Sequence, residues 1–385
     1  MNETAAPATR LAIVGIHGHG SSHVVRAHAL TRRGEATLVA VADPRPAVNL
    51  ALDPGVAQFA SLAELLAAVE VDVVVLCTPI HTHFKLTKLA LEAGVDVLLE
   101  KPPVTSSGDF AALTEVLRAT GRRCQVGFQS LGSHAISAIL ERVGRGEIGE
   151  VTGVSASGSW LRRREYWSRA AWAGKRTLNG VEVVDGVVTN PFAHAVATAL
   201  RLAGATRVGD VASVDLDQYR ANDIDCDDTS VVRIRTSAGI PVTLALTLCA
   251  AERSEPSVTV HGTAGRIVMF YAIDVVQLFR ANQDEPVMTT QYGRTELLAD
   301  LIAVRRGGPA ALVADFADTE AFTLVLDAVR RAPEPRSIAA EYIDWVGVGA
   351  QAHPVVQGIE GWIARAGREH KTFAELGALW ADAEA

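Results

Sequence analysis

The stretch LAIVGIHGHG, residues 11–20, decides the fold of the first third of this chain. An apolar run typical of a strand leads into a turn rich in glycine, and residues 21–31 then follow the pattern of a helix. This order brings backbone N–H groups and a helix N-terminus up to a pyrophosphate, so it predicts a dinucleotide-binding Rossmann unit. The alternative for a single glycine motif is a plain tight turn between a strand and a helix.

The glycine turn departs from the usual G-x-G-x-x-G pattern at one place. Gly15 and Gly20 fit the outer positions, but His17 stands at the middle position and Gly18 is displaced by one residue. We assign all four residues to the cofactor-binding site. His17 then either crowds the pyrophosphate or contacts it.

An acidic residue follows the glycine turn at the distance that ribose recognition requires. The second predicted strand ends at Asp43, about 20 residues beyond the motif, where a carboxylate can accept hydrogen bonds from ribose hydroxyls. Asp43 therefore indicates NAD, whereas Arg45 could offset the repulsion of a 2′-phosphate and leaves NADP open. The alternative for Asp43 is an Asp-Pro turn without a ligand.

The first third of the chain alternates apolar runs with amphipathic segments, which is the pattern of parallel strands covered by helices on both faces. We predict strands at residues 11–15, 37–42, 71–77, 95–99 and 124–128. The predicted fold class is therefore α/β, with a doubly wound parallel sheet in a dinucleotide-binding Rossmann domain over residues 1–130.

Beyond residue 130 the predicted strands follow one another, separated by short turns that contain glycine. We predict strands at residues 229–236, 241–248, 257–261 and 266–270. We predict helices at residues 135–143, 318–331 and 357–366. Residues 131–385 are therefore expected to form an α+β domain with a large, predominantly antiparallel sheet that binds substrate and mediates oligomerisation.

The composition of the 385 residues excludes several classes of protein. With 49% hydrophobic and 21% charged residues the chain is expected to be globular, and a net charge of −8 argues against nucleic acid as a partner. The chain has no apolar run that could span a bilayer and no export segment, so we expect a cytoplasmic protein without a membrane partner. The four cysteines lack paired spacing, and His17, His19 and His23 have no acidic or cysteine partner in their segment, so we expect no metal.

Two further segments follow predicted parallel strands, at the sheet edge where ligands of doubly wound folds bind. They are Cys77-Thr78-Pro79-Ile80-His81-Thr82-His83 and Glu100-Lys101-Pro102. Their T-P-x-x-x-H and E-K-P patterns resemble the Gfo/Idh/MocA family of oxidoreductases, in which both follow the Rossmann strands. The matching residues are Thr78, Pro79, His83, Glu100, Lys101 and Pro102, and we assign all but the last to the cofactor site.

The resemblance implies roles for a lysine and a histidine. In the family the lysine of E-K-P, here Lys101, hydrogen-bonds the reacting hydroxyl, and the histidine of a D-x-x-x-H helix, here His194, is the general base. Asn190 replaces the aspartate of that motif, so either His194 works alone or a nearby carboxylate such as Asp185 stabilises its charge. The alternative for Asn190 is a cap of the helix that runs to about Ala203.

Residues 164–175 combine scarce aromatic side chains with basic ones, and we assign Tyr166, Trp167, Arg169 and Trp172, with Lys101, Asn190 and His194, to the substrate-binding site. Aromatic faces beside Arg donors suit a polyhydroxylated ligand. The alternative is aromatic packing at a domain or subunit interface. We interpret the acidic residues 222–228 as a turn entering a strand rather than a metal site.

The leading hypothesis is an NAD(P)-dependent dehydrogenase that acts on a ring hydroxyl or ketone of a sugar, sugar derivative or cyclitol. The resemblance leaves two alternatives open: a cofactor-retaining lyase or glycoside-cleaving enzyme, and a non-enzymatic regulator that senses a dinucleotide or a sugar. We expect a homodimer or homotetramer.

Overall fold

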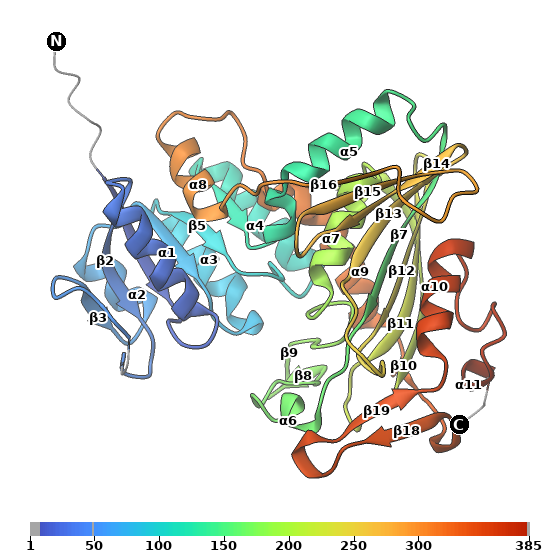
Figure 1. The fold of residues 1–385 in the computed structure, drawn as a ribbon. Helices are drawn as coiled ribbons and strands as arrows, with labels where there is room; N and C mark the ends of the chain where they lie inside the picture. Colours follow the sequence, from blue (N-terminus) through green and yellow to red (C-terminus); the bar gives the residue numbers. More distant parts are fainter. Residues whose placement is uncertain (1–7, 48–49, 383–385) are drawn as a thin grey trace. The chain divides into compact units, whose positions relative to one another are not determined.

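The computed structural model describes residues 8–47 and 50–382. The chain forms two compact units, the first made of residues up to Phe128 together with Thr295–Ala317, and the second of Gln129–Arg294 and Asp318 onward (Figure 1). The single boundary predicted at residue 130 is therefore too simple, because residues 295–317 return to the first unit.

Polar contacts explain why this later segment belongs to the first unit. Arg305, at the end of helix α8 (Leu297–Arg305), donates hydrogen bonds to Asp96 at 2.8 Å and to Asp72 at 2.9 Å. The side chain of Gln125 donates to Asp300 at 2.8 Å. These partners lie 175 to 233 residues apart in the chain, so no local pattern predicts them.

The first unit contains a six-stranded sheet in the order β3-β2-β1-β4-β5-β6, and every neighbouring pair is parallel. Its strands are β1 (Thr9–Val14), β2 (Ala36–Ala42), β3 (Ala57–Phe59), β4 (Val73–Leu76), β5 (Asp96–Leu99) and β6 (Cys124–Val126). The predicted doubly wound sheet is confirmed, with β3 as a sixth strand that the sequence did not indicate because its three residues carry no periodic pattern.

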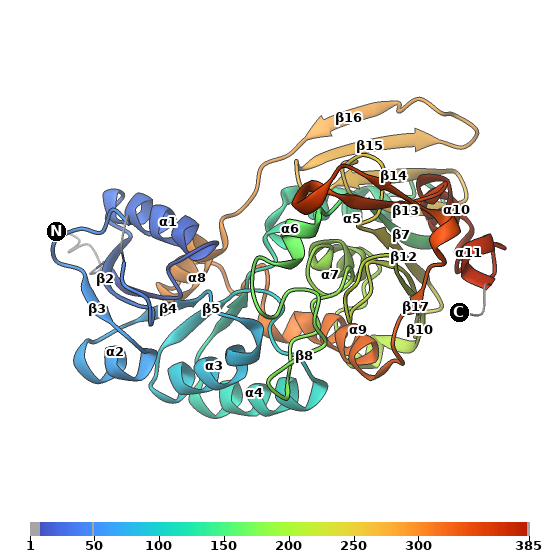
Figure 2. The same cartoon turned by 90° about the horizontal axis from the view of Figure 1, so that it is seen from below.

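Helices cover both faces of this sheet, as the continuous apolar runs of its strands require. They are α1 (Gly20–Arg32), α2 (Leu62–Ala68), α3 (His83–Glu92) and α4 (Ser107–Thr120). Figure 2 shows α1 on one face and α2, α3 and α4 on the other. Every residue of β4 and β5 is buried, as are most residues of β1 and β2, so this sheet forms the core of the unit.

The second unit contains a nine-stranded, mostly antiparallel sheet in the order β16-β15-β14-β13-β7-β12-β11-β10-β17. Its strands are β7 (Val151–Ser159), β10 (Val211–Arg220), β11 (Thr229–Thr236), β12 (Pro241–Thr247), β13 (Ser257–Gly262), β14 (Gly265–Phe270), β15 (Val275–Arg280), β16 (Met288–Gln291) and β17 (Arg336–Ser337). Only the β7–β12 and β10–β17 pairs are parallel. The predicted class of this unit is confirmed.

Two helices lie on opposite faces of the large sheet (Figure 1). Residues of β7 alternate between the faces: a Cβ on Gly158 would collide with the ring of Phe192, just before α7 (Ala193–Leu202). A Cβ on Gly367, in α10 (Ile359–Glu369), would lie 3.2 Å from Ser157 Oγ. Helix α10 therefore covers part of the face that an open antiparallel sheet would leave to solvent.

The remaining elements complete the second unit. They are α5 (His134–Gly144), α6 (Arg164–Trp167), β8 (Thr177–Leu178), β9 (Val181–Glu182), α9 (Glu320–Arg331), β18 (Ile343–Val346), β19 (His353–Val356) and α11 (Leu379–Asp382). The four cysteines are unpaired and three of them are buried, as expected. No helix in residues 8–47 and 50–382 combines the length and the apolar character needed to cross a bilayer.

Candidate functional site

In the glycine turn between β1 and α1, the backbone of the glycines packs directly against other backbone atoms. Gly15 has φ +81°, and a Cβ there would collide with the carbonyl oxygen of Cys77. A Cβ on Gly20 would collide with the carbonyl oxygen of Gly15, whereas Gly18 has φ +59° with open space around it. The displaced Gly18 thus supplies a left-handed, unobstructed position beside the N-terminus of α1, which is what the close approach of a pyrophosphate requires.

His17 lies inside this turn with one ring nitrogen unsatisfied. Its Nε2 is buried and has no hydrogen-bond partner among the residues that the structure describes. A buried polar atom without a partner costs free energy, so the site fits a ligand group that would supply one. This favours His17 as a contact of a bound dinucleotide over His17 as an obstacle.

Asp43 follows β2 and fastens the glycine turn to it. Its carboxylate accepts hydrogen bonds from the Ile16 amide at 3.1 Å and from the Arg45 amide at 3.0 Å, and the Arg45 Nε lies 3.2 Å away. Burial alone would raise the pKa of Asp43, but these hydrogen bonds outweigh it and lower the pKa below its ordinary value. Asp43 is therefore ionised. It begins the Asp-Pro turn, and it also holds the glycine turn in position through the Ile16 amide.

A cavity of about 310 Å³ opens beside Asp43. It is lined by Ile16, Val41, Asp43, Pro44, Arg45, Pro46, Ala47, Gln58, Phe59 and Ala60. Its volume lies at the lower end of the range of about 300–1,000 Å³ that small-molecule pockets occupy. The residues present fit the adenosine half of a dinucleotide, with a carboxylate beside an apolar wall.

The T-P-x-x-x-H segment links two loops at the carboxyl edge of the parallel sheet. His83 is 1% exposed, and its two ring nitrogens lie 2.8 Å from the Pro102 carbonyl oxygen and 2.9 Å from that of Thr78. Burial lowers the pKa of His83, so the ring is neutral and donates to one of the two carbonyls at a time. Both nitrogens thus lie within hydrogen-bonding distance of protein carbonyls, so His83 holds the loop of Thr78 and Pro79 to the Lys101–Pro102 turn. Its assignment to the cofactor site stays a prediction.

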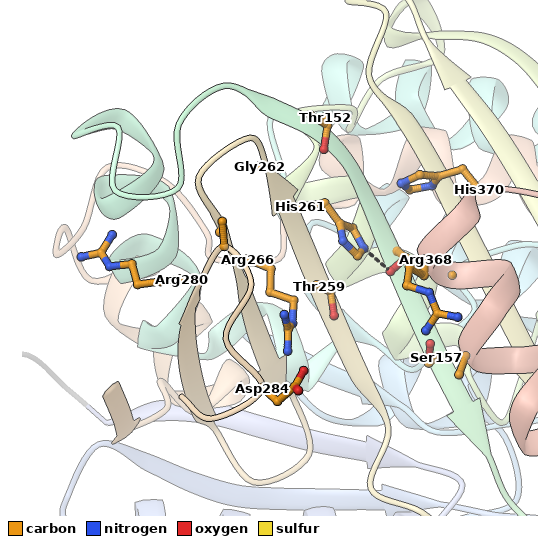
Figure 3. Close-up of a pocket in the computed structure, with 15 residues that line it drawn as sticks. Thr152, Ser157, Thr259, His261, Gly262, Arg266, Arg280, Asp284, Arg368 and His370 are labelled. Carbon is orange, nitrogen blue, oxygen red and sulfur yellow. Dashed lines mark hydrogen bonds between the residues drawn. The ribbon is translucent and has the colours of Figure 1, made fainter. Parts of the chain in front are cut away.

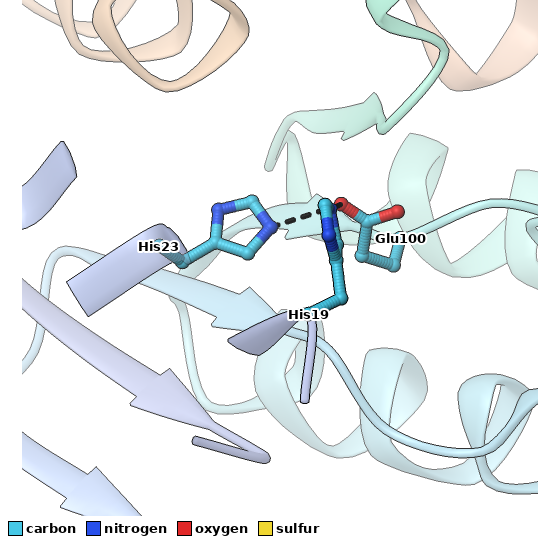
Figure 4. Close-up of side chains that lie close together, drawn as sticks. All are labelled: His19, His23 and Glu100. Atoms are coloured by element: carbon cyan, nitrogen blue, oxygen red, sulfur yellow. Dashed lines mark hydrogen bonds and ion pairs between the residues drawn. The ribbon is translucent and has the colours of Figure 1, made fainter. Parts of the chain in front are cut away.

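Glu100 is the centre of a polar cluster at the end of β5 (Figure 4). Its Oε1 accepts hydrogen bonds from His23 Nε2 at 2.9 Å and from His19 Nε2 at 3.2 Å, and its Oε2 accepts from the Lys101 amide at 3.2 Å. Burial would raise the pKa of Glu100, but the two histidines outweigh it and lower the pKa well below its ordinary value. An ionised Glu100 therefore ties the glycine-turn helix to the turn that carries Lys101.

The same cluster changes the argument about metal. The expectation of no metal relied on the absence of an acidic partner near His19 and His23, yet Glu100 reaches both from a strand 77 residues away from His23. The three ligand atoms lie within 4.8 Å of one another. The premise is correct for the histidines' own segment, but it does not exclude a metal, because sequence spacing does not reveal a ligand that the fold brings in from elsewhere in the chain.

Asn190 and His194 lie in the second unit, and their local structure differs from the prediction. Helix α7 begins at Ala193, so Asn190 precedes it in a turn and does not share a helix face with His194. The residue directly before the helix is Phe192, and the Asn190 Nδ2 donates a hydrogen bond to Asp185 at 2.6 Å. His194 Nδ1 lies 3.5 Å from the hydroxyl of Ser130, a residue that the sequence did not single out.

Asp185 is the acidic partner that the Asn190 motif lacks. It is 3% exposed and accepts hydrogen bonds from Asn190, from the Arg169 guanidinium at 2.7 Å and from the Gly174 amide at 2.8 Å. A buried carboxylate that accepts from three donors is fixed in position. Asp185 therefore joins the Asn190 turn to the aromatic segment.

The aromatic segment is a stack of rings and guanidinium groups. Arg162 lies 4.6 Å from the centre of the Tyr166 ring, and Arg169 lies 3.8 Å from Tyr166 and 4.6 Å from Trp172. Trp167 packs edge to face on Tyr166 at 4.9 Å. Tyr166 and Trp172 therefore have cation–π partners within the second unit, and the stacking of a sugar on the aromatic faces stays a prediction.

The acidic residues 222–228 form the predicted turn. Asp228 is buried and accepts hydrogen bonds from the amides of Ala221 and Asn222, directly before β11. Its neighbour Asp227 packs so closely on Gly186 that a Cβ there would collide with a carboxylate oxygen. This contact positions the loop before Asn190, and only the fold reveals it.

Both units define the class of this protein: an oxidoreductase with an NAD-binding Rossmann domain and a mostly antiparallel second domain. Residues 9–128 match the model described as an oxidoreductase family with an NAD-binding Rossmann fold, and residues 136–268 match the Gfo/Idh/MocA C-terminal domain. The chain belongs to the Gfo/Idh/MocA family, as its motifs predicted.

The matches to curated relatives cover less than half of the chain. Inositol 2-dehydrogenase of Rhizobium meliloti is 32% identical over 138 residues, which are 36% of this chain and 42% of that protein. D-glucoside 3-dehydrogenase of Escherichia coli is 30% identical over 185 residues, 47% of this chain and 51% of that protein. The chain thus spans about half, or less, of these relatives.

A solved structure shares the fold over most of both chains. The WlbA dehydrogenase of Bordetella pertussis, solved in complex with NADH and UDP-GlcNAcA, is similar with a TM-score of 0.68. The match covers 84% of this chain and 96% of that one at 24% identity.

Proposed function

We propose that this protein is an NAD-dependent dehydrogenase that oxidises or reduces a ring hydroxyl or ketone of a sugar, sugar derivative or cyclitol. Its family membership and the names of its relatives, inositol 2-dehydrogenase and D-glucoside 3-dehydrogenase, support this reaction class. The observation that carries the proposal is the turn at Lys101, fastened to the glycine-turn helix through Glu100, His19 and His23.

The chain's own residues divide the proton chemistry between them. The bound dinucleotide supplies a hydride acceptor for the substrate C–H bond. Lys101 donates a hydrogen bond to the reacting hydroxyl, and its positive charge lowers the pKa of that hydroxyl. His194 accepts the hydroxyl proton, and in the reverse direction it returns the proton to the new alcohol oxygen.

Asp185 takes the charge-stabilising role in this proposal. The amide of Asn190 cannot accept a proton, but its hydrogen bond to Asp185 supports a pairing in which amide and carboxylate replace the family's single aspartate. The same carboxylate orients Arg169, which we propose as a donor to substrate hydroxyls beside Tyr166, Trp167 and Trp172.

The contacts of Asp43 favour NAD over NADP. A 2′-phosphate would meet an ionised carboxylate, and the Arg45 guanidinium that could compensate is already hydrogen-bonded to Asp43. We propose that Asp43 accepts hydrogen bonds from the ribose hydroxyls in the cavity beside it.

The test is a panel of sugars and cyclitols with NAD⁺ or NADP⁺, monitored at the NADH absorbance band. We expect substrate-dependent NADH formation that is stronger with NAD⁺. Turnover without net NADH would favour the cofactor-retaining lyase, and cofactor binding without turnover would favour the sensor. The proposed homodimer or homotetramer is tested by sedimentation.

The Lys101→Ala variant tests the catalytic assignment. Loss of the donor should lower kcat by about 100-fold or more while NADH still binds, because the substitution keeps the Lys101 amide that donates to Glu100. Lys88→Ala is the matched control, since Lys88 is a half-exposed lysine on α3 paired with Glu92. Unchanged turnover in Lys101→Ala would overturn the assignment.

A further inference from the structure

A second cavity lies in the second unit, on the face of the large sheet that carries α10 (Figure 3). Its volume is about 630 Å³. Strands β7, β13 and β14, the end of β15 with the turn after it, and one side of α10 form its walls. Helix α7, which carries His194, lies on the opposite face of the sheet, so this cavity is separate from the candidate catalytic residues of this unit.

The floor of the cavity consists of hydroxyl groups where an apolar layer would be usual. Ser155 and Ser157 of β7 and Thr259 of β13 line it, while their neighbours Val154 and Ala156 are fully buried toward α7. A sheet face that meets a helix normally presents apolar side chains to it. Serine and threonine hydroxyls at these positions can donate to and accept from a polar ligand.

Two histidines extend this floor. His261 Nε2 lies 2.8 Å from Ser155 Oγ, and His370 Nδ1 lies 2.9 Å from Thr243 Oγ1, with the two rings 5.4 Å apart. Burial, His370 and the nearby Arg266 lower the pKa of His261 to about 4. At neutral pH its ring is uncharged, so it can serve as a hydrogen-bonding group without repelling a cationic wall.

Two arginines on different elements line the cavity. Arg266 extends from β14 along the Phe279 ring at 4.0 Å, and Arg368 extends from the last turn of α10. In the described part of the chain neither guanidinium forms an ion pair with a carboxylate. Asp284 contributes one carboxylate to the lining, whereas Arg280 points away from the centre in Figure 3 and donates to the Glu147 carbonyl.

We propose that this cavity binds a phosphorylated sugar or polyol. Two arginines without carboxylate partners are suited to an anion such as phosphate, which guanidinium groups bind by charge-assisted hydrogen bonds. The floor of serine, threonine and neutral histidine side chains suits a carbon skeleton with several hydroxyls. The volume is within the range of about 300–1,000 Å³ that organic ligands occupy, so the site holds more than a bare ion.

The proposal is tested by calorimetric titration of the full chain with glucose 6-phosphate, inositol 1-phosphate and glycerol 3-phosphate. Glucose, inositol, glycerol and inorganic phosphate serve as the separate parts of these ligands. We expect at least one phosphate ester to bind more tightly than either of its parts. Arg266→Gln with Arg368→Gln should weaken that binding by about tenfold or more, because two charge-assisted contacts are lost.

Two control variants test whether a loss of binding is specific to this cavity. Arg365→Gln removes the same charge from α10, but Arg365 pairs with Glu369 at 3.2 Å and does not line the cavity, so binding should be unchanged. His194→Ala should also leave binding unchanged, which separates this site from the proposed active site.

Four results would overturn the proposal. They are no saturable binding of any phosphate ester, full binding in the double variant, an equal loss in Arg365→Gln, and a loss in His194→Ala. A changed oligomeric mass in the double variant without ester binding would instead identify the face as an interface between copies.

Discussion

The glycine turn of the first unit and the Asn190–His194 segment of the second are held by different kinds of contact. The turn is held by backbone packed on backbone, at Gly15 and Gly20. The Asn190 segment is held by side chains that converge on the carboxylate of Asp185. The first arrangement is fixed by residue type and local spacing, whereas the second depends on partners that tertiary structure brings together.

The largest expected effect is at the glycine turn. Gly20→Ala places a Cβ against the Gly15 carbonyl oxygen, so backbone must shift where the pyrophosphate is proposed to bind. We expect the Kd for NADH to rise by about 100-fold or more, measured by fluorescence titration. Gly34→Ala is the control, because Gly34 lies beyond the other end of α1, open space surrounds it, and only its φ of +71° opposes alanine, at a cost of about 1 kcal/mol. Equal effects of the two variants would contradict this account.

This contrast explains which parts of the site the sequence could predict. The parts of the site that the sequence predicted each follow a strand of a parallel sheet: the glycine turn, Asp43, and the segments around Thr78 and Lys101. The alternation of strand and helix patterns along the chain therefore predicts that they lie at one edge of the sheet. The family resemblance added the E-K-P and T-P-x-x-x-H motifs, and both lie where it implied. Sequence spacing could not predict the contact of Glu100 with His23, which links the E-K-P motif to the glycine-turn helix.

The sequence was least informative where a contact spans the chain. The return of residues 295–317 to the first unit depends on Arg305 reaching Asp72 across 233 residues, which has no periodic signature. The D-x-x-x-H comparison predicts a helix that opens at Asn190, whereas α7 begins at Ala193. The pairing of Asn190 with Asp185, five residues earlier, instead holds Asn190 in a turn.

The second prediction concerns the side-chain cluster itself. Asp185→Asn removes a charge that Arg169 and Asn190 share, and hydrogen bonds to charged groups contribute about 2 kcal/mol, so kcat/KM should fall by about 30-fold. The Kd for NADH should stay unchanged. Asp225→Asn is the control, because Asp225 is half exposed and pairs with the half-exposed Lys175. A change in NADH affinity without a change in kcat/KM would contradict the positioning role.

The third prediction uses the pH dependence of stability to probe the loop before Asn190. Burial raises the pKa of Asp227 from 3.8 to about 6, above its value in the unfolded chain. Between these values the folded protein binds more protons than the unfolded one, so this group's contribution to stability falls as pH rises from about 4 to 6. The Asp227→Asn variant has no carboxyl group at this position, so it does not lose this stability as the pH rises.

We therefore expect Asp227→Asn to raise Tm by about 2–4 °C at pH 8 and to leave it nearly unchanged at pH 4, measured by calorimetry. The carboxamide keeps an acceptor for the Ser230 hydroxyl, which Asp227 now binds at 2.7 Å. Asp225→Asn, which removes a half-exposed carboxylate from the same loop, is the control. A variant less stable than the parent at every pH would show that the charged carboxylate stabilises the loop.

The smallest expected effect is that of metal on the Glu100 cluster. His19 and His23 both lie with Nε2 against the same oxygen of an ionised Glu100, so the cluster is already satisfied by charge-assisted hydrogen bonds. A zinc ion would have to displace both N–H protons and replace these bonds. We expect chelation with EDTA, or addition of zinc, to leave kcat/KM and Tm unchanged. Glu100→Gln should instead lower Tm with or without chelator, since a neutral amide cannot hold two histidines as a carboxylate does. Loss of activity on chelation, restored by zinc, would contradict this and assign the two histidines and Glu100 as metal ligands.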